Sequence, residues 1–309
     1  MALRPYLIDE IARDCVAGAL TRREAIRRLG LLGVTGAAAA AMVAGAPMNA
    51  VRAGGESTVP SPDTTSGSTA PIAEAEEVTF PGPDGELIGG YSAADAPKGA
   101  VLVIHENRGL TPHIRTIPPR LAVDGYSALA IDLLSAEGGT ATMSEGDAQA
   151  ALGNAPAERL VADLQAGLDE LERRVPDAEL AVIGFCFGGG MTWQLLAAGD
   201  PRISAAVPFY GPFPDGADLS GSPNAAVLGI YAELDDFVNP SMESAAAALE
   251  AAGLEHELVT FEGVDHAFFN DTGRNYDADA AAEAYSVMLD WFDRHLTSSP
   301  SASTTEPAS

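Results

Sequence analysis

Basic residues are scarce in this chain of 309 residues, which has 17 Lys and Arg against 44 Asp and Glu, with Lys98 as its only lysine. The resulting net charge of −27 would repel polyanions, so we exclude nucleic-acid binding. Cysteine is also rare: Cys15 and Cys186 are too few and too far apart for a disulfide framework or a Cys-rich metal site. The hydrophobic content of 47%, by contrast, is enough to bury a substantial core.

The N-terminal part of the chain, residues 1–53, has the opposite charge balance, with seven arginines and four acids. Thr21-Arg22-Arg23 precedes an uncharged stretch rich in Ala and Gly, residues 29–51. This order predicts a twin-arginine export signal, recognised by the export machinery and cleaved between Ala46 and Ala53. We therefore expect a periplasmic or extracellular protein, or one tethered to the membrane if the signal is not cleaved.

Two further segments contain mostly small and polar residues, Gly, Ser, Thr and Pro. Such segments bury too little apolar surface to offset the entropy lost on ordering. We therefore expect residues 54–75 to be a disordered linker, residues 297–309 to be a disordered tail, and residues 76–296 to form the folded domain. The sequence shows no internal repeat, and we expect a monomer.

The folded domain alternates short apolar runs with longer stretches of helical periodicity, which predicts a parallel sheet with helices on both faces. The predicted parallel strands are 101–104, 127–131, 180–183, 203–210, 225–231 and 258–261. The clearest predicted helices are 157–174, 241–252 and 278–295. Before them, 77–80 and 86–91 flank the turn Gly82-Pro83-Asp84-Gly85 and predict an antiparallel hairpin. A hairpin followed by six parallel strands is the arrangement of an α/β-hydrolase.

One strand leads directly into a glycine-rich turn with a cysteine at its centre, Gly184-Phe185-Cys186-Phe187-Gly188, and then into a helical run. This pattern predicts a nucleophile elbow with Cys186 in the position usually held by serine. Glycine at the flanking positions avoids side-chain clashes in the strained turn. We expect the dipole of the following helix to lower the pKa of the thiol. The alternative is a buried structural cysteine beside a flexible turn.

Two later strands also end in polar residues, in the order that an α/β-hydrolase requires. Asp235 follows the strand 225–231, and His266 follows the strand 258–261. Both lie at carboxyl ends of parallel strands, where ligands bind in open sheets. We expect His266 to act as the base and Asp235 to orient its ring; Asp236 and Asp265 are the competing acids. In the alternative reading, Asp235 caps a loop and His266 is an exposed turn residue.

An oxyanion hole needs two backbone N–H donors near the nucleophile. Phe187, directly after the nucleophile, is the first candidate, and Asn107, in the loop after the first parallel strand, is the second. Glu106 would then lie beside the sulfur, where its carboxylate could tune the thiol or take its proton.

These motifs together resemble the dienelactone hydrolase family. Four segments carry the resemblance, in the family's order: 104–110, 130–133, 184–189 and 265–268. The resemblance implies that Cys186, Asp235 and His266 form the catalytic triad and that Glu106 is the glutamate beside the oxyanion donor. It also implies hydrolysis of enol-lactones without a metal or organic cofactor.

The sequence departs from the family at the position four residues after the catalytic histidine, where members carry an arginine that binds the substrate carboxylate. Asn270 occupies that position here. Arg274 could replace the missing arginine, although a solvated loop arginine is an equal alternative, and Phe268 could form a wall of an apolar acyl pocket. The fold and the triad transfer from the family better than the substrate does.

The nucleophile limits the chemistry independently, because a thiolate leaves a tetrahedral intermediate more readily than an ordinary alkoxide does. A cysteine hydrolase therefore suits enol-lactones and activated esters better than amides or simple alkyl esters. Our first hypothesis is an exported cysteine-dependent hydrolase of small lactones or activated esters. The alternatives are a broad carboxylesterase of the same fold and an inactive binding protein of the cell envelope.

Overall fold

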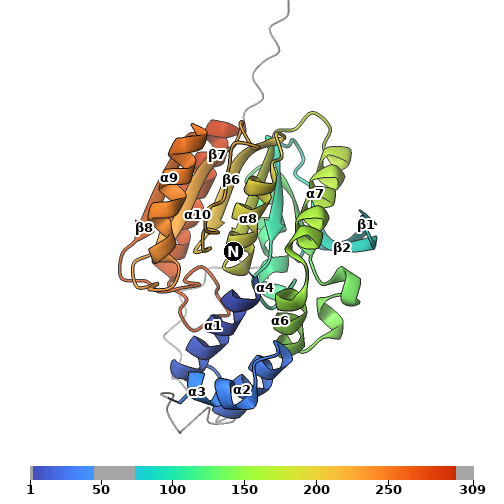
Figure 1. Cartoon of the computed structure of the whole chain (residues 1–309). Coiled ribbons are helices and arrows are strands. Elements are labelled where there is room, and N and C mark those ends of the chain that lie inside the picture. The colour runs from blue at the N-terminus through green and yellow to red at the C-terminus, as the bar shows by residue number, and fades with distance from the viewer. Residues whose placement is uncertain (1–2, 45–73, 297–309) are drawn as a thin grey trace, which may run out of the picture.

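An eight-stranded sheet forms the centre of the protein in a computed structural model that describes residues 3–44 and 74–296 (Figure 1). Its strands are β1 (Glu76–Gly82), β2 (Gly85–Ser92), β3 (Gly99–Ile104), β4 (Tyr126–Asp132), β5 (Leu180–Phe185), β6 (Ile203–Phe209), β7 (Ala226–Ala232) and β8 (His256–Phe261). Their order in the sheet is β1-β2-β4-β3-β5-β6-β7-β8. The pairs β1–β2 and β2–β4 are antiparallel, and the other pairs are parallel.

Helices cover both faces of this sheet. In the domain they are α4 (Pro112–Arg115), α5 (Ile117–Val123), α6 (Glu145–Asn154), α7 (Ala157–Arg174), α8 (Phe187–Ala198), α9 (Met242–Ala252) and α10 (Ala278–His295). Three short 3₁₀ helices are also present, η1 (Ser135–Glu137), η2 (Thr140–Thr142) and η3 (Asn239–Ser241). Helices α7 and α8 contact each other on one face, and α10 lies behind the sheet in the view of Figure 1.

The sequence prediction of the sheet is confirmed. Each predicted strand overlaps an observed one, and the predicted hairpin is β1–β2. Every residue of β3, β4, β5 and β7 is buried. Strands covered by helices on both faces read as continuous apolar runs, which explains why they could be located from the sequence.

The described N-terminal residues form three helices, α1 (Leu3–Val16), α2 (Arg22–Leu31) and α3 (Gly36–Met42). Leu7 and Ile11 of α1 and Leu29 of α2 are fully or almost fully buried, and both helices contact α6. The packed structure therefore extends beyond the expected unit of residues 76–296, because apolar side chains one helical turn apart give these helices a face that packs on the domain.

Part of the N-terminal prediction lies outside the described residues. The expected cleavage positions between Ala46 and Ala53 do, as do the tail and most of the linker. Within the described part of the chain, none of the helices is both long and apolar enough to cross a membrane.

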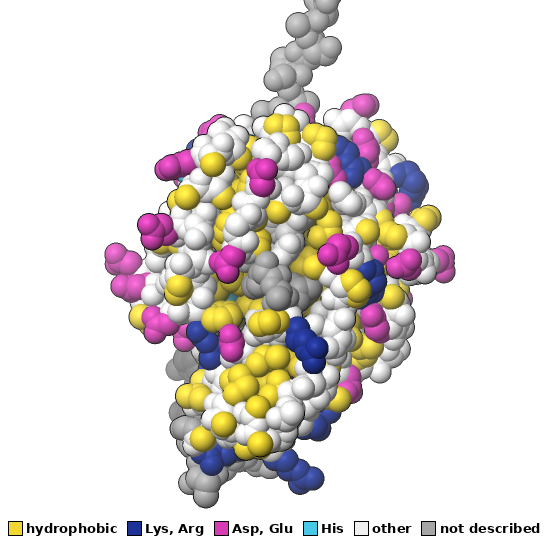
Figure 2. Space-filling view, viewed as in Figure 1, with side chains coloured by type: hydrophobic (Ala, Val, Ile, Leu, Met, Phe, Trp, Pro, Cys, Tyr) yellow, Lys and Arg dark blue, Asp and Glu magenta, His cyan; other side chains and the backbone are white. Residues whose placement is uncertain are grey.

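Charge is distributed unevenly over the surface. In Figure 2, acidic side chains are scattered over the sheet domain, whereas hydrophobic side chains gather over the N-terminal helices. The same helices carry a salt-bridge cluster: Arg28 contacts Glu24 of its own helix at 2.7 Å and Glu145 of α6 at 3.4 Å. The Arg28 guanidinium also donates to the Gln149 side chain at 2.8 Å. The basic N-terminal segment is thus attached to the acidic domain through α6.

Candidate active site

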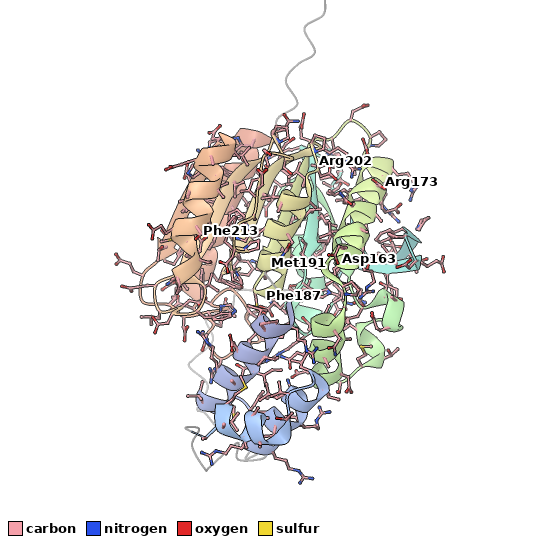
Figure 3. All side chains as sticks on the ribbon, viewed as in Figure 1. Asp163, Arg173, Phe187, Met191, Arg202 and Phe213 are labelled. Atoms are coloured by element: carbon pink, nitrogen blue, oxygen red, sulfur yellow. The ribbon has the colours of Figure 1, made fainter. Side chains whose placement is uncertain are left out.

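Cys186 lies in the sharp turn between β5 and α8, with φ +57° and ψ −114°. A side chain on Gly184 would overlap the Gly188 carbonyl, and one on Gly188 would overlap the carbonyl of Ile104 in β3. Only glycine therefore fits at positions 184 and 188, two residues before and two residues after the cysteine. The turn places the sulfur at the N-terminal end of α8, where Figure 3 labels Phe187. The elbow geometry expected from the sequence is present.

The expectation that the pKa of the Cys186 thiol is lowered is wrong. Burial, together with the charge of Glu10 and partly offset by His266, raises the pKa of Cys186 to about 12. Glu106 raises it further. The side chain is 3% exposed, so the loss of hydration and two nearby carboxylates outweigh the partial charge of one helix end. At rest, Cys186 is a thiol that needs a proton acceptor.

His266 and Asp235 form a close pair beside this turn, with Nδ1 of His266 2.6 Å from Oδ2 of Asp235. The other carboxylate oxygen, Oδ1, accepts the backbone N–H groups of Phe237 and Val238. Burial opposes charge on His266, but the Cys186 sulfur and the Asp235 hydrogen bond raise its pKa well above the ordinary value. Burial likewise opposes charge on Asp235, yet the hydrogen bond to His266 lowers its pKa.

The competing acids are elsewhere. Asp236 is exposed, and the Asp265 carboxylate accepts the backbone N–H of His266 at 2.7 Å. Asp235 is therefore the acid that holds the ring.

Glu106 and Asn107 are both buried in the loop after β3, and both line the cavity that reaches Cys186. His105 anchors this loop: its Nε2 accepts the Leu133 N–H at 3.1 Å, and its Nδ1 lies 2.6 Å from the Glu106 carbonyl oxygen. Burial lowers the pKa of His105, in keeping with a neutral, structural ring. One Glu106 oxygen accepts the Asn270 amide at 2.6 Å. That Asn107 and Phe187 stabilise an oxyanion stays a prediction.

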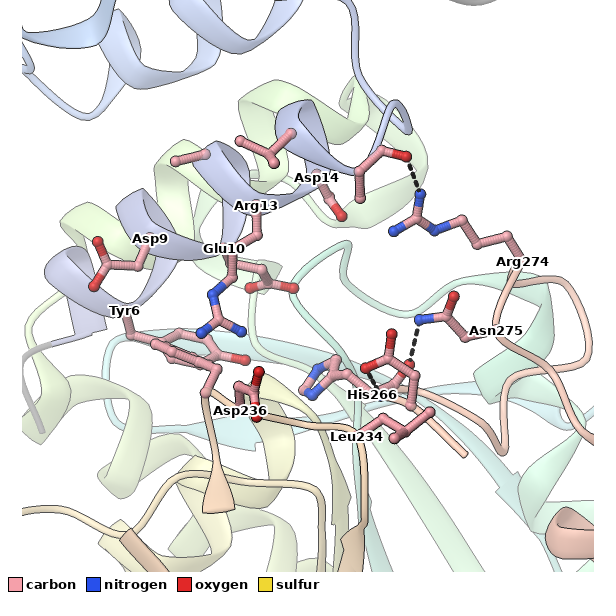
Figure 4. Close-up of a pocket in the computed structure, with 15 residues that line it drawn as sticks. Tyr6, Asp9, Glu10, Arg13, Asp14, Leu234, Asp236, His266, Arg274 and Asn275 are labelled. Carbon is pink, nitrogen blue, oxygen red and sulfur yellow. Dashed lines mark hydrogen bonds between the residues drawn. The ribbon is translucent and has the colours of Figure 1, made fainter. Parts of the chain in front are cut away.

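Sequence reasoning missed two residues at the sulfur, Tyr6 and Glu10, both on α1. The Tyr6 hydroxyl lies 3.0 Å from Cys186 Sγ, and Sγ lies 3.5 Å from Glu10 Oε1. Figure 4 shows both side chains pointing from α1 toward the His266 loop. Their i,i+4 spacing, which places both side chains on one helix face, is the feature of the sequence that indicates a shared role. The arginines that follow indicate an export signal instead, and this second pattern is the stronger one.

Three reactive groups thus meet at one point. A carboxylate oxygen of Glu10, Cys186 Sγ and a ring nitrogen of His266 all lie within 4.8 Å of one another. These atom types could also bind a metal ion, but an ion bound to the Cys186 sulfur would prevent that sulfur from acting as a nucleophile. The arrangement is suited to proton transfer around a nucleophile.

Two cavities adjoin this cluster, and α1 forms a wall of each. The cavity that reaches Cys186 has a volume of about 330 Å³ and is also lined by Glu10, Glu106, Asn107 and His266. The second cavity, of about 590 Å³, lies between α1 and the loops after β7 and β8 and is lined by Tyr6 (Figure 4). A cavity of the first size can hold a small organic molecule.

Comparisons with known proteins match the same part of the chain. The model of the dienelactone hydrolase family matches residues 88–296. The chain belongs to this family. It is 33% identical over 215 residues to a "Putative carboxymethylenebutenolidase" of Escherichia coli O157:H7, covering 65% of this chain and 79% of that protein. A relative of the same description from Saccharolobus solfataricus is 30% identical, over 71% of this chain and 98% of the relative.

Solved structures agree with this assignment. The crystal structure of a "Putative Dienelactone Hydrolase" from Klebsiella pneumoniae superposes with a TM-score of 0.63 at 30% identity, covering 72% of this chain and 98% of that one. The chain is therefore a hydrolase of ester bonds with the fold of the dienelactone hydrolase family. The family match begins within β2, so α1, α2 and α3 lie outside it.

The two candidate substrate-binding residues have different surroundings in this dienelactone hydrolase fold. Arg274 lines both cavities, but its guanidinium donates to the Ala17 carbonyl at the end of α1 at 2.8 Å. Phe268 is fully buried, packs against the rings of Tyr210 and Phe261, and lines neither cavity. Phe268 thus belongs to the core under the site, because the chain turns its side chain inward after His266.

Proposed function

We propose that the protein is a cysteine-dependent hydrolase of lactones or activated esters. Cys186 is the nucleophile, His266 moves protons, and Asp235 orients the His266 ring. The backbone N–H groups of Asn107 and Phe187 stabilise the oxyanion. The observation that carries the proposal is the strained Cys186 turn beside the 2.6 Å His266–Asp235 pair.

The reaction follows the usual two steps of covalent catalysis. The Cys186 thiol gives its proton to a neighbouring carboxylate, and the sulfur attacks the carbonyl carbon. The carbon–oxygen bond of the ester or lactone then breaks. The leaving oxygen takes a proton from His266. A water molecule, deprotonated by His266, then attacks the thioester and releases the acid and the thiolate, which takes its proton back from the carboxylate.

The charges around the cavity favour a neutral substrate over an anionic one. The family's arginine is replaced by Asn270, whose amide is bound to Glu106. Arg274 is engaged by the Ala17 carbonyl, and Arg108 lies 3.6 Å from Glu145. Three carboxyl groups, those of Glu10, Asp14 and Glu106, also line the cavity. This is the specific observation in favour of the second candidate, a broad carboxylesterase with the same machinery.

The experiment compares two substrates on the full chain: a neutral phenyl ester and an enol-lactone bearing a carboxylate. We expect kcat/KM to be higher for the neutral ester by about tenfold or more, since both arginines that line the cavity, Arg108 and Arg274, already have partners in Glu145 and the Ala17 carbonyl. The rate of each substrate is followed by absorbance, with Cys186→Ala as the blank. A faster lactone reaction would mean that Arg108 or Arg274 binds the carboxylate. Equal rates in wild type and Cys186→Ala for both substrates would refute the proposed function.

We also propose that the chain is exported by the twin-arginine route. Supporting this, Arg22 and Arg23 begin α2, Arg23 is exposed, and no charged residue occurs between residues 29 and 51. We expect Arg22→Lys with Arg23→Lys to keep the protein in the cytoplasm, whereas Arg27→Lys, in the same helix, leaves export unchanged. Cell fractionation and immunoblotting measure the distribution. An exported double variant would contradict the proposal.

A further inference from the structure

The helix α1 is held against the active-site loops at several independent points. The ring of Tyr6 packs on that of Phe237, with centroids 5.3 Å apart. The Arg13 guanidinium lies over the same Phe237 ring at 4.1 Å. At the end of the helix, Ala17 accepts the hydrogen bond from Arg274. These contacts fix α1 next to the loops that carry Asp235 and His266.

The side chains that α1 places at the sulfur are desolvated. Tyr6 is 3% exposed, and its hydroxyl has Cys186 Sγ as its neighbour at 3.0 Å. Burial, with the nearby Cys186 and Glu10, raises the pKa of Tyr6 well above its ordinary value, so the phenol keeps its proton and can donate it in a hydrogen bond. Oε2 of Glu10 is buried and has no hydrogen-bond partner among the described residues.

The helix forms a wall of the site, and the nucleophile still borders a cavity. Cys186 lines the cavity of about 330 Å³, and Tyr6 does not. Tyr6 lines the neighbouring cavity, from which Cys186 is absent. The Tyr6 ring therefore closes one approach to the sulfur and leaves the other open, next to Glu10, Asn107 and His266. With this geometry α1 lines the site without filling the cavity in front of the sulfur, as a helix that blocked the site would.

We propose that α1 supplies two catalytic residues: Glu10 accepts the proton of the Cys186 thiol, and the Tyr6 hydroxyl donates a hydrogen bond to the thiolate that results. This inference rests on the proposed function, since it needs Cys186 to be the nucleophile. It goes beyond the family match, because both residues lie outside the matched segment.

The proton balance of the cycle is complete with these groups. The S–H bond breaks, Glu10 becomes a neutral acid, and the thiolate forms beside protonated His266. The thiolate attacks the carbonyl, the carbon–oxygen bond breaks, and His266 protonates the leaving oxygen. Neutral His266 then deprotonates the attacking water, and the thiolate released from the thioester recovers its proton from Glu10. The net reaction consumes one ester and one water.

Glu10 suits the first transfer better than His266 does. Burial, opposed by His266 and aided by Asp14, raises the pKa of Glu10 to about 7, so the carboxyl group exchanges protons near neutral pH. Burial opposes charge on His266, but once the thiolate forms, the sulfur and the Asp235 hydrogen bond raise the pKa of His266, so the ring keeps a proton for the later transfer to the leaving oxygen. Oε1 of Glu10, 3.5 Å from Sγ, is the acceptor on the thiol in the structure.

The test uses four variants of the full chain: Glu10→Gln, Tyr6→Phe, and two controls of the same chemical change. Glu158→Gln, at the exposed start of α7, and Tyr91→Phe, on β2, lie away from the site. We expect Glu10→Gln to lower kcat/KM for the phenyl ester by about 100-fold and to remove the acid limb of the pH profile near pH 7. Tyr6→Phe should lower kcat/KM by about tenfold, and the controls should match wild type.

A second readout does not depend on the choice of substrate. The rate at which iodoacetamide alkylates Cys186, followed by mass spectrometry across pH, reports thiolate formation in the same variants. We expect slower alkylation near neutral pH in Tyr6→Phe, which loses the donor to the thiolate. In Glu10→Gln the charge that raises the thiol pKa is gone, so alkylation should be at least as fast as in wild type while kcat/KM falls. Wild-type or faster kcat/KM in both variants, or a wild-type alkylation rate in Tyr6→Phe, would overturn the inference and identify α1 as a cover instead. If Cys186→Ala also kept full activity, the proposed function itself would fail.

Discussion

Replacing Cys186 with alanine is expected to lower kcat/KM by about 10⁴-fold or more, because the change removes the sulfur that attacks the carbonyl. The strained backbone of the turn, with φ +57°, presents this side chain to the cavity, and glycine is required at positions 184 and 188. Alanine keeps the Cβ atom and removes only the sulfur. The measurement is phenyl ester hydrolysis under saturating and limiting substrate, with circular dichroism to show that the variant is folded.

The matched control is Cys15→Ala, which removes the protein's second thiol. Cys15 is also buried and free, but it lies on α1 and lines neither cavity. We expect its kcat/KM to remain within about threefold of wild type, in line with an ordinary change of one buried sulfur. A Cys186→Ala variant that retains more than about one tenth of the wild-type rate would identify a different nucleophile and rule out covalent catalysis by Cys186.

The sheet and the order of the reactive residues could be predicted because both depend on short stretches of the sequence. Buried parallel strands are continuous apolar runs, and the polar residues directly after them must lie at one edge of the sheet. Asp235 and His266, 31 positions apart, could be paired for that reason. The choice of Asp235 over Asp236 and Asp265 depends on backbone direction in two loops, which only the structure provides.

The electrostatics of the thiol and the role of α1 could not be predicted in the same way. The helix dipole is a local property, so a lowered pKa followed from the elbow motif alone. Burial and the carboxylates of Glu10 and Glu106 are tertiary properties, and they act in the opposite direction on Cys186. Glu10 is 176 positions from Cys186 and belongs to a segment whose composition indicates export.

The two proposals for the N-terminal segment constrain each other. Cleavage between Ala46 and Ala53 would remove α1, and with it Tyr6 and Glu10. If Glu10 accepts the thiol proton, the processed protein has to lose most of its activity, or the segment has to stay attached after export. Export through the twin arginines and catalysis by α1 are compatible in one chain when the N-terminal helices remain packed on the domain, where Leu7, Ile11 and Leu29 are buried. Mapping the mature N-terminus together with the activity of that form distinguishes these cases.

The second large effect is expected from Asp235→Asn, which should lower kcat by about 10²- to 10⁴-fold. The carboxylate lies 2.6 Å from Nδ1 of His266 and fixes which ring nitrogen carries a proton. An amide in its place can donate to Nδ1 and so favour the wrong tautomer. Losing the negative charge also lowers the pKa of His266, so the limb of the pH–rate profile that reports this ring should move to lower pH.

The pH–rate profile separates this role from a purely structural one. Asp236→Asn, at the neighbouring exposed acid, removes the same charge and should leave both kcat and the profile within about threefold of wild type. A loss of activity in Asp235→Asn without any movement of the His266 limb would mean that the loop had collapsed, because Asp235 also holds the backbone N–H groups of Phe237 and Val238. Movement of the limb with an intact thermal transition instead assigns the loss to the ring of His266, and therefore to the proton it carries.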